Sequence, residues 1–404
     1  TAAMLDATIP GFCWEGFLPA RCTHLSDSHC LIELIPDPDK PPRCQHCRQP
    51  CQQIHDTTVR RVRDRDLFEY KVWLDVPVRR LRCPRCSVAR EQLDWLAPHS
   101  RITHRFQQHI EVLLTLLPIK HVALLSGLHW HTLKALDKAR LARSVPEPDL
   151  DQVRFLVMDE FALFKGHRYA TVVMDAERTQ VLWVGEGRSR EAIRPFFEWM
   201  GKHCQQIQAV AMDMNTAMDL EVKEHCPQAK VVYDLFHVVA KFGREVIDRV
   251  RVDQANQLRH DKPARKAVKR SRWLLLRNRS NLKQDQEAQL EALLEVNKPL
   301  MLVYIMKDQL KGLWYAKSER AARWRFTHWM RQAQASKLEP LIRFARLLKP
   351  YAEGVIASAS YRLNTSVLEG VNNKIKVIKR MAYGYRDSDY FFLKIKAAFP
   401  GNPR

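Results

Sequence analysis

The feature that most constrains the fold is a succession of apolar, β-branched segments in the middle of the chain. These segments cover residues 153–161, 168–176, 180–187, 207–213 and 229–234. Runs of this length and composition predict strands, and the first three follow one another at hairpin spacing. Residues 190–204 and a short stretch before 229 have a helical pattern. The predicted order is therefore three antiparallel strands, a helix, and then parallel strands that alternate with helices.

Two aspartates lie at the ends of these strands. Asp159 lies in VMDEF, at the end of the first strand, and Asp213 lies in AMDMN, where the fourth strand ends. A carboxylate there is costly to bury unless it is paired or binds a metal, although a single one is more often a turn residue. The strand order is that of a ribonuclease-H-like sheet, and two acids in this order favour a metal site. Four other acids compete for the same role: Glu160, Asp175, Glu186 and Asp219. Glu160 is the strongest competitor, but strand alternation places it on the opposite face.

A further carboxylate lies in TSVLEGVNNKIKVIKRMAYGYR, at 365–386. At about 100° per residue, a helix here has an apolar side that consists of Leu368, Val371, Ile375 and Ile378. Its polar side consists of Glu369, Asn372, Asn373, Lys376 and Arg380. A carboxylate among cations can hold a divalent metal while its neighbours hold phosphate. The alternative is that Ser366 and Glu369 form a capping box, in which case Glu369 only caps its own helix.

The charge of the chain indicates a polyanionic partner. Its 404 residues carry a formal net charge of +21, and 46% of them are hydrophobic. This balance favours nucleic acid or an anionic membrane as the partner. No run of 18 apolar residues is present, so a membrane span is not expected. The N-terminal stretch TAAMLDATIPGFCWEGF lacks a basic region followed by an apolar core, so a signal peptide is not expected either. We expect a cytoplasmic protein of about two to four domains.

Two C-x2-C pairs predict a zinc site. Cys44 and Cys47 form the first pair, and Cys83 and Cys86 the second. Four thiolates from two turns can surround zinc tetrahedrally, and in a protein that is not secreted they favour a metal over disulfides. The segments 57–62 and 68–78 between the pairs predict the short strands of a zinc ribbon.

Two questions about the cysteines stay open. Cys51 can compete with Cys47 as a zinc ligand. Residues 1–38 contain Cys13, Cys22 and Cys30 at spacings that match no metal motif, and their role is open.

Residues 105–144 have a helical pattern. An amphipathic helix ends before Pro118, and residues 120–143 read as helix, turn at Gly127, and second helix. This is the layout of a helix-turn-helix whose second helix enters the major groove; the alternative is an αα-hairpin within a bundle. The residues expected to face DNA are His131, Thr132, Lys134 and Lys138.

The expected architecture is multidomain α+β. Residues 241–350 look wholly helical, and their basic stretch at 262–279 is either a solvated face or a surface that follows phosphates. The predicted parts are an N-terminal segment of unclear role (1–38), a zinc-ribbon domain (39–100), a helix-turn-helix DNA-binding domain (101–147), the first part of a ribonuclease-H-like α/β catalytic core (148–238), an all-α insertion (239–350), and the closing helix and tail of the core (351–404).

Together these motifs resemble bacterial insertion-sequence transposases of the ISL-three (ISL3) family, DDE transposases with a ribonuclease-H-like catalytic core. The resemblance runs from Cys44 almost to the C-terminus and is most specific in VMDEF, AMDMN, YDLFHVV and LEGVNNKIKVIKRMAYGYR. It implies an acidic triad, which by position consists of Asp159, Asp213 and Glu369. Asp234 and His237 match the D-x2-H signature of related transposases. The resemblance also implies that the N-terminal modules recognise the terminal inverted repeats of the element.

The chemistry of the residues agrees with this resemblance. Two divalent ions can support phosphodiester hydrolysis and strand transfer without a covalent enzyme intermediate. Asp159 would bridge both ions, Asp213 and Glu369 would each complete one, and oxygen ligands favour Mg2+ or Mn2+. Lys376, Lys379 and Arg380 would neutralise phosphates, and Asn372 or Asn373 would position a base or a backbone oxygen. His237 would orient Asp234 or a phosphate, or is a structural histidine.

The expected function is a metal-dependent DNA transposase that acts as a homodimer or higher assembly on double-stranded DNA, associated with the nucleoid. The assembly is expected because two element ends must be brought together. One alternative is a structure-specific nuclease on the same fold, which would cut DNA but join nothing. Another is a catalytically inactive, transposase-derived DNA-binding regulator, against which the intact acids argue. An RNA-binding structural protein is disfavoured, because the aromatic residues are spread through apparent cores and no stacking motif is evident.

Overall fold

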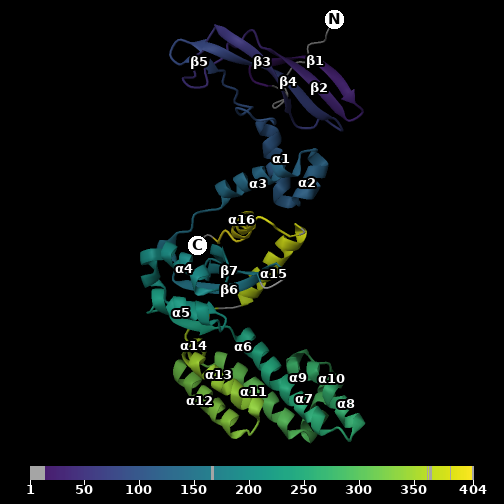
Figure 1. Ribbon diagram of the computed structural model, residues 1–404, viewed down its shortest axis with the longest axis vertical. Helices are drawn as coiled ribbons and strands as arrows, with labels where there is room; N and C mark the ends of the chain where they lie inside the picture. The colour runs from purple at the N-terminus through teal and green to yellow at the C-terminus, as the bar shows by residue number, and fades with distance from the viewer. Residues whose placement is uncertain (1–13, 165–167, 362, 364–365, 383, 403–404) are drawn as a thin grey trace. The chain divides into compact units, whose positions relative to one another are not determined.

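The computed structural model in Figure 1 describes residues 14–164, 168–361, 363, 366–382 and 384–402, and only the backbone of residues 366–369. The chain divides into two compact units, Thr1–Ala142 and Arg143–Arg404. None of the helices within the described ranges combines the length and apolar character that a membrane span requires.

The first unit begins with a sheet of five strands. They are β1 (Phe17–Ser26), β2 (His29–Pro36), β3 (Ile54–Arg63), β4 (Lys71–Cys83) and β5 (Ser87–Arg90). The order is β1-β2-β4-β3, and β5 pairs with β4. Side chains at every second position of β4, from Val72 to Val78, are buried, as a strand with one covered face requires. The strand predicted at 57–62 lies within β3, whereas the strand predicted at 68–78 overlaps β4, which begins only at Lys71.

The first two strands belong to this same sheet. β2 runs parallel to β4, from His29 opposite Lys71 to Glu33 opposite Asp75. Residues 17–36 therefore belong to the same sheet as β3 to β5, whereas the predicted boundary after residue 38 separates them from it. The sequence carries no local signal for this, because a parallel pair is joined by a long connection rather than a tight turn.

A buried carboxylate connects this sheet to the helices that follow. Asp64 is fully buried and accepts hydrogen bonds from Trp14 Nε1 (2.9 Å), Thr103 Oγ1 (2.6 Å) and Arg105 Nε (2.8 Å). Burial opposes its ionisation, but these donors together hold the pKa of Asp64 below its usual value. Because Thr103 also caps the first helix, the sheet and the helices are fixed to each other within this unit.

Three helices complete the first unit: α1 (His104–Leu116), α2 (Ile119–Ser126) and α3 (Trp130–Ser144). They pack around a small apolar core that includes Phe106, Ile110 and Leu133. Gly127 ends α2 in the left-handed region at φ 72°, a conformation that glycine adopts without strain. The helix, turn and helix therefore lie where the sequence predicts them.

The second unit is built on another five-stranded sheet. Its strands are β6 (Phe155–Phe164), β7 (Arg168–Asp175), β8 (Gln180–Glu186), β9 (Ala209–Met212) and β10 (Lys230–Tyr233). The order is β10-β9-β6-β7-β8. β6, β7 and β8 are antiparallel, whereas β9 and β10 run parallel to β6. This is the order and direction that the sequence predicts.

Helices cover both faces of this sheet. On one face α4 (Arg190–Met200) and α5 (Thr216–His225) share a core with Leu156 and Met158. On the other face α15 (Ser366–Met381) and α16 (Ser388–Ala398) share a core with Val157 and Phe161. Alternate residues of β6 thus face opposite layers, which fixes where its acidic residues can point.

A helical insertion separates β10 from α15. Figure 1 shows α6 leading from the sheet into it. Its helices are α6 (Leu235–Phe242), a π-helical segment (Gly243–Ile247), α7 (Asp248–Gln257), α8 (Lys262–Arg270), α9 (Arg272–Leu276), α10 (Gln284–Val296), α11 (Lys298–Trp314), α12 (Glu319–Ala335), α13 (Glu339–Leu348) and α14 (Ala352–Ala357).

The insertion is anchored on the edge strand β10. Trp314 Nε1 donates a hydrogen bond to the carbonyl oxygen of Tyr233, 2.9 Å away. Gly354 lies so close to the Tyr233 ring that an added Cβ would come within 2.3 Å of it. Any larger residue at 354 would push α14 off the strand. The insertion also shares the largest apolar core with the sheet, including Leu300 and Phe344.

Candidate functional site

The centre of the candidate site is Asp159 on β6. Its side chain is only 4% exposed. The backbone N–H of Glu160 donates to its Oδ1 at 2.7 Å, and Asn372 Nδ2 on α15 donates to its Oδ2. Burial, and then the nearby charge of Asp213, raise the pKa of Asp159 to about 6. A carboxylate held this way gains from a cation, because the positive charge offsets both the cost of burying a carboxylate and the repulsion from Asp213.

Asp213 and Asp234 follow the neighbouring parallel strands β9 and β10. The two aspartates lie close together because neighbouring parallel strands end at the same edge of a sheet. Asp234 is buried and caps α6 by accepting the N–H of Phe236 at 2.8 Å. His237, in the first turn of α6, places Nδ1 2.6 Å from Asp213 Oδ1 and 2.8 Å from Asp234 Oδ2. Ligand atoms of these three side chains all lie within 4.8 Å of one another.

The imidazole of His237 lies between two carboxylates. Hydrogen bonds to Asp213, and then to Asp234, raise its pKa to about 10. A histidine with a raised pKa stabilises the fold fully below its ordinary pKa of about 6.5, and this contribution is lost as the pH rises through the folded-state value. We therefore expect His237→Gln to lower the melting temperature of the metal-free protein by roughly 2 °C at pH 6. The difference should shrink as the pH is raised toward 10 in differential scanning calorimetry.

The matched control is His328→Gln on α12, because His328 is exposed and faces Trp324 and Gln332 rather than carboxylates. It should melt like the parent at every pH. A His237→Gln difference that is the same at pH 6 and pH 9 would mean that the imidazole is neutral and merely packs.

α15 contributes the basic side of the site. Val371 and Ile375 are buried against the sheet, as predicted for the apolar side of this helix, and Ile378 packs beside them. Its polar side lines a cavity of about 1340 Å³ together with Asp159, Asp213 and His237. The α15 residues in this lining are Asn372, Ile375, Lys376, Lys379 and Arg380.

The outcomes for the other α15 residues differ. Lys379 Nζ donates to the carbonyl oxygen of Ala162 at 3.0 Å, so it is held at the rim by β6. Asn373 is exposed and lines a neighbouring cavity. The backbone of Glu369 lies in α15, but the side chains of Glu369 and Leu368 lie outside the described residues.

Three of the four competing acids have other partners away from the cavity. Asp175 ends β7 and accepts the N–H of Glu177 at 2.9 Å. Glu186 faces Arg168 at 3.5 Å, and Asp219 accepts the Tyr233 hydroxyl at 2.7 Å. None of the three lines the cavity around Asp159.

Glu160 is the exception. It follows the strand alternation, since it faces the side of Met158, but it still lines the same cavity as Asp159. Asn215 Nδ2 donates to it, and Arg188 Nη1 lies 3.4 Å away. Neither Asn215 nor Arg188 is among the residues predicted from the sequence to lie at this site. The position of Asn215, two residues after Asp213 in AMDMN, is the signal that could have identified it.

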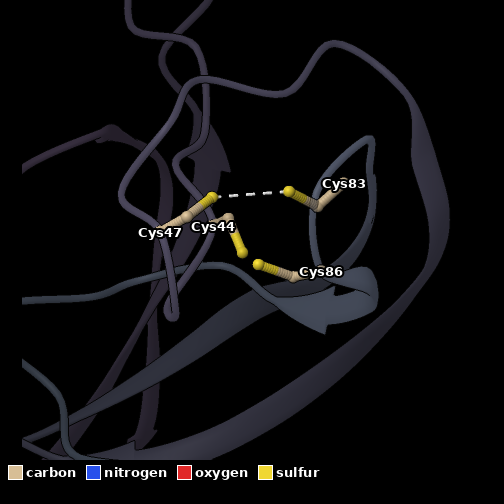
Figure 2. A group of neighbouring side chains, drawn as sticks. All are labelled: Cys44, Cys47, Cys83 and Cys86. Atoms are coloured by element: carbon tan, nitrogen blue, oxygen red, sulfur yellow. Dashed lines mark hydrogen bonds between the residues drawn. The ribbon is translucent and has the colours of Figure 1, made fainter.

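The second candidate site is the cysteine group of the first unit, drawn in Figure 2. The sulfur atoms of Cys44, Cys47, Cys83 and Cys86 point toward one another and all lie within 4.8 Å. Those of Cys47 and Cys83 are 3.5 Å apart. Zinc–sulfur bonds of about 2.3 Å in tetrahedral geometry place sulfurs about 3.8 Å apart, so the four thiols fit zinc.

Cys51, the fifth cysteine of this region, lies next to the four-sulfur group. Cys51 is buried, and its Sγ donates to the carbonyl oxygen of Gln49 at 3.5 Å. Within the described residues, the group with metal-ligand spacing consists of the four predicted cysteines without Cys51. Cys13 lies outside the described residues, and Cys22 and Cys30 lie on β1 and β2.

The helix predicted to enter DNA presents a polar face. Leu133 is on the buried side of α3. On the same helix His131 and Thr132 are exposed, and Lys134 and Lys138 are half-buried. The His131 ring stacks on His129, and Lys134 Nζ lies 5.7 Å from the Trp130 ring centre. All four predicted residues therefore reach the surface of this helix.

Comparisons with known families agree with these features. A family model described as "Transposase" matches residues 156–395, and a model described as "Helix-turn-helix domain of transposase family ISL3" matches residues 91–141. The transposase for insertion sequence element IS1001 of Bordetella parapertussis is 54% identical over 394 residues, which cover 97% of each chain. The transposase for insertion sequence element IS1557 of Mycobacterium tuberculosis is 24% identical over 368 residues, covering 85% of this chain and 82% of the relative.

A solved structure, the Drosophila P element transposase strand transfer complex, aligns with 73% of this chain and 90% of that chain. Its TM-score is 0.36 at 9% identity. The family match to residues 156–395 and the 54% identity over 97% of the chain are decisive. The chain belongs to the ISL3 family of insertion-sequence transposases, enzymes of the DDE class with a helix-turn-helix DNA-binding domain.

Proposed function

We propose that this transposase cuts and joins DNA at a two-metal site made by Asp159, Asp213 and Glu369 on a ribonuclease-H-like sheet. The observation that carries this proposal is the pair Asp159 and Asp213. Asp159 lies on β6 and Asp213 directly follows the adjacent strand β9, both line one cavity, and the pKa of Asp159 is raised to about 6 by burial and by the charge of Asp213. The strand order β10-β9-β6-β7-β8 and the basic face of α15 support the same reading.

The residues present fit divalent cations with oxygen ligands. Carboxylates favour Mg2+ or Mn2+ over softer metals. Within the described residues, the Oδ1 atom of Asn372 is buried without a hydrogen-bond partner, although its Nδ2 contacts Asp159. This amide oxygen, left without a hydrogen-bond partner in a cavity that also contains two carboxylates, is a further oxygen ligand that a cation can use. When bound, the ions would activate water or a 3′-hydroxyl group and stabilise the leaving oxygen.

The protein's own groups then have distinct tasks. Asn372 orients the Asp159 carboxylate, which differs from the base or backbone contact expected from the sequence. His237 places a positive charge between Asp213 and Asp234 and keeps both carboxylates at the edge of the sheet. Lys376, Lys379 and Arg380 line the same cavity and neutralise phosphates next to the cut.

The first unit selects the DNA that reaches this site. In the proposal, the four cysteines hold one structural zinc ion, and α3 reads the terminal inverted repeats through His131, Thr132, Lys134 and Lys138. The enzyme acts as a homodimer or higher assembly on the nucleoid, since joining needs two ends in one complex.

The proposal is tested with end-labelled DNA that carries the element's ends and a separate plasmid target. With Mg2+, the full-length protein should give both cut ends and joined products, and without added Mg2+ or Mn2+ it should bind the ends without cutting them. Cut ends without any joined product would favour the structure-specific nuclease. Binding without cutting in Mg2+ would favour the inactive regulator.

A further inference from the structure

A second cavity opens beside the candidate active site. Its volume is about 1480 Å³, and it shares Asp159, His237, Asn372 and Lys376 with the first cavity. From there it extends into the helical insertion, between α6, the π-helical segment, α9 and the C-terminal end of α11. A strand that passes the catalytic carboxylates can therefore continue directly into this cavity.

Three large aromatic rings in its lining face solvent. Phe236 is 65% exposed, Trp273 is 62% exposed and Tyr315 is 72% exposed. They come from three different segments of the chain and gather at one cavity. Aromatic rings usually bury most of their surface, so three exposed rings in one lining indicate a surface that another flat group covers.

Cations accompany these rings. Arg244, Arg277 and Lys317 are exposed in the same lining, and among the described residues no carboxylate pairs with them. The Arg272 guanidinium lies 5.4 Å from the Trp273 ring centre, with its Nε 2.8 Å from Asp248. The acidic groups of the lining, Asp159 and Asp234, lie at the catalytic end.

Exposed aromatic rings among unpaired cations are the combination that binds single-stranded nucleic acid. The rings stack on base faces, and the cations hold the phosphates. Bases within a duplex already stack on their neighbours, so their faces are hidden from a protein ring. The surface therefore fits an unpaired strand better than a duplex.

We propose that this cavity binds an unpaired segment of the DNA strand beside the cut, with bases stacked on Trp273, Tyr315 and Phe236 and phosphates on Arg244, Arg277 and Lys317. The inference rests on the proposed function, because it assumes that DNA is cut at Asp159. It adds a strand-separating role for the helical insertion, which opens the duplex end at the site of cleavage.

The test uses the full-length protein and two fluorescent probes. One is a 20-nucleotide oligothymidine with a single 2-aminopurine, and the other is the same strand in a duplex. Trp273→Ala and Tyr315→Ala should each weaken binding of the single strand roughly tenfold and reduce 2-aminopurine quenching, with little change for the duplex. The matched control is Trp324→Ala on α12, because Trp324 is 68% exposed and does not line the cavity.

The outcome is decisive in either direction. Unchanged single-strand binding in both variants would overturn the proposal. So would an equal loss of affinity for the duplex, or an equal loss of single-strand affinity in Trp324→Ala. A second variant does not rely on the aromatic rings. Arg277→Ala should reduce the slope of log affinity against log salt for the single strand by about 0.7, whereas Arg259→Ala, outside the lining, should leave it unchanged.

Failure of this inference differs from failure of the proposed function. Asp159→Asn should abolish cleavage and keep the single-strand affinity, because Asp159 lies at the acidic end of the cavity. If Asp159→Asn cuts DNA normally, the catalytic assignment fails while the binding result stands. If only the Trp273 and Tyr315 variants behave like the parent, the cavity loses its role while the catalytic assignment stands.

Discussion

Asp159→Asn is expected to lower DNA strand cleavage roughly a thousandfold while the protein still binds the element ends. Asp159 would help to hold the ions, so its loss should remove several kcal/mol of transition-state stabilisation, and each 1.36 kcal/mol corresponds to a factor of ten in rate. Asparagine keeps the size of the side chain and can still accept the Glu160 N–H. The measurement is the single-turnover rate of cleavage in Mg2+, with end binding measured in parallel.

The matched control is Asp175→Asn in the same sheet. Asp175 is also buried, and burial likewise raises its pKa, but it ends β7 and does not line the cavity. Cleavage should be retained in this variant. Equal losses in the two variants would mean that any buried aspartate of the sheet supports the fold and that Asp159 has no special role.

The same variant has a second, independent readout in its stability. A raised pKa means that the metal-free fold loses stability as the pH rises from about 4, the unfolded value, through about 6, the folded value of Asp159. Above this window the parent is destabilised by the charged carboxylate, and Asp159→Asn is not. At pH 8 the metal-free variant should therefore melt higher than the parent, and Mg2+ should raise the melting temperature of the parent alone.

Cys44→Ser is expected to abolish zinc binding and to unfold the N-terminal sheet. Zinc binding contributes on the order of 10 kcal/mol in small zinc modules, which is comparable to the whole stability of a domain. The cysteine group joins the loop before β3 to the turn between β4 and β5. Because Asp64 links this sheet to α1, binding of the element ends should fall as well. Zinc per chain is measured by mass spectrometry and end binding by anisotropy.

Two other cysteines serve as controls for this prediction. Cys22→Ser changes an exposed thiol on β1 and should leave one zinc per chain. Cys51→Ser should also keep the metal, since Cys51 lies outside the four-sulfur group. If Cys44→Ser keeps zinc, or if Cys51→Ser loses it, the four zinc ligands are not Cys44, Cys47, Cys83 and Cys86.

Much of the catalytic unit follows from local patterns in the sequence. Apolar, β-branched runs identify β6 to β10, and hairpin spacing with intervening helices predicts their order. The helical period of α15 correctly places Val371 and Ile375 toward the sheet. Asp159 and Asp213 are noticeable in the sequence because they are acids beside apolar runs. Asp213 directly follows β9, as predicted, but Asp159 lies within β6, which continues to Phe164 instead of ending near the acid.

Long-range contacts could not be predicted in this way. The parallel pairing of β2 with β4, and the contact between Asn372 and Asp159, join segments without a shared local pattern. Aromatic residues spread through helices look like core residues in the sequence. In the structure, Trp273 and Tyr315 are exposed and line the second cavity.

The most direct test of the central claim is strand cleavage of DNA that carries the element's ends, in Mg2+, by the parent and by Glu369→Gln. Glutamine keeps the size and helix propensity of residue 369 and removes only its charge. Our account predicts that cleavage is lost while binding of the ends is retained, which would assign Glu369 to the metal site. Undiminished cleavage would contradict it, since Glu369 would then only cap its own helix with Ser366.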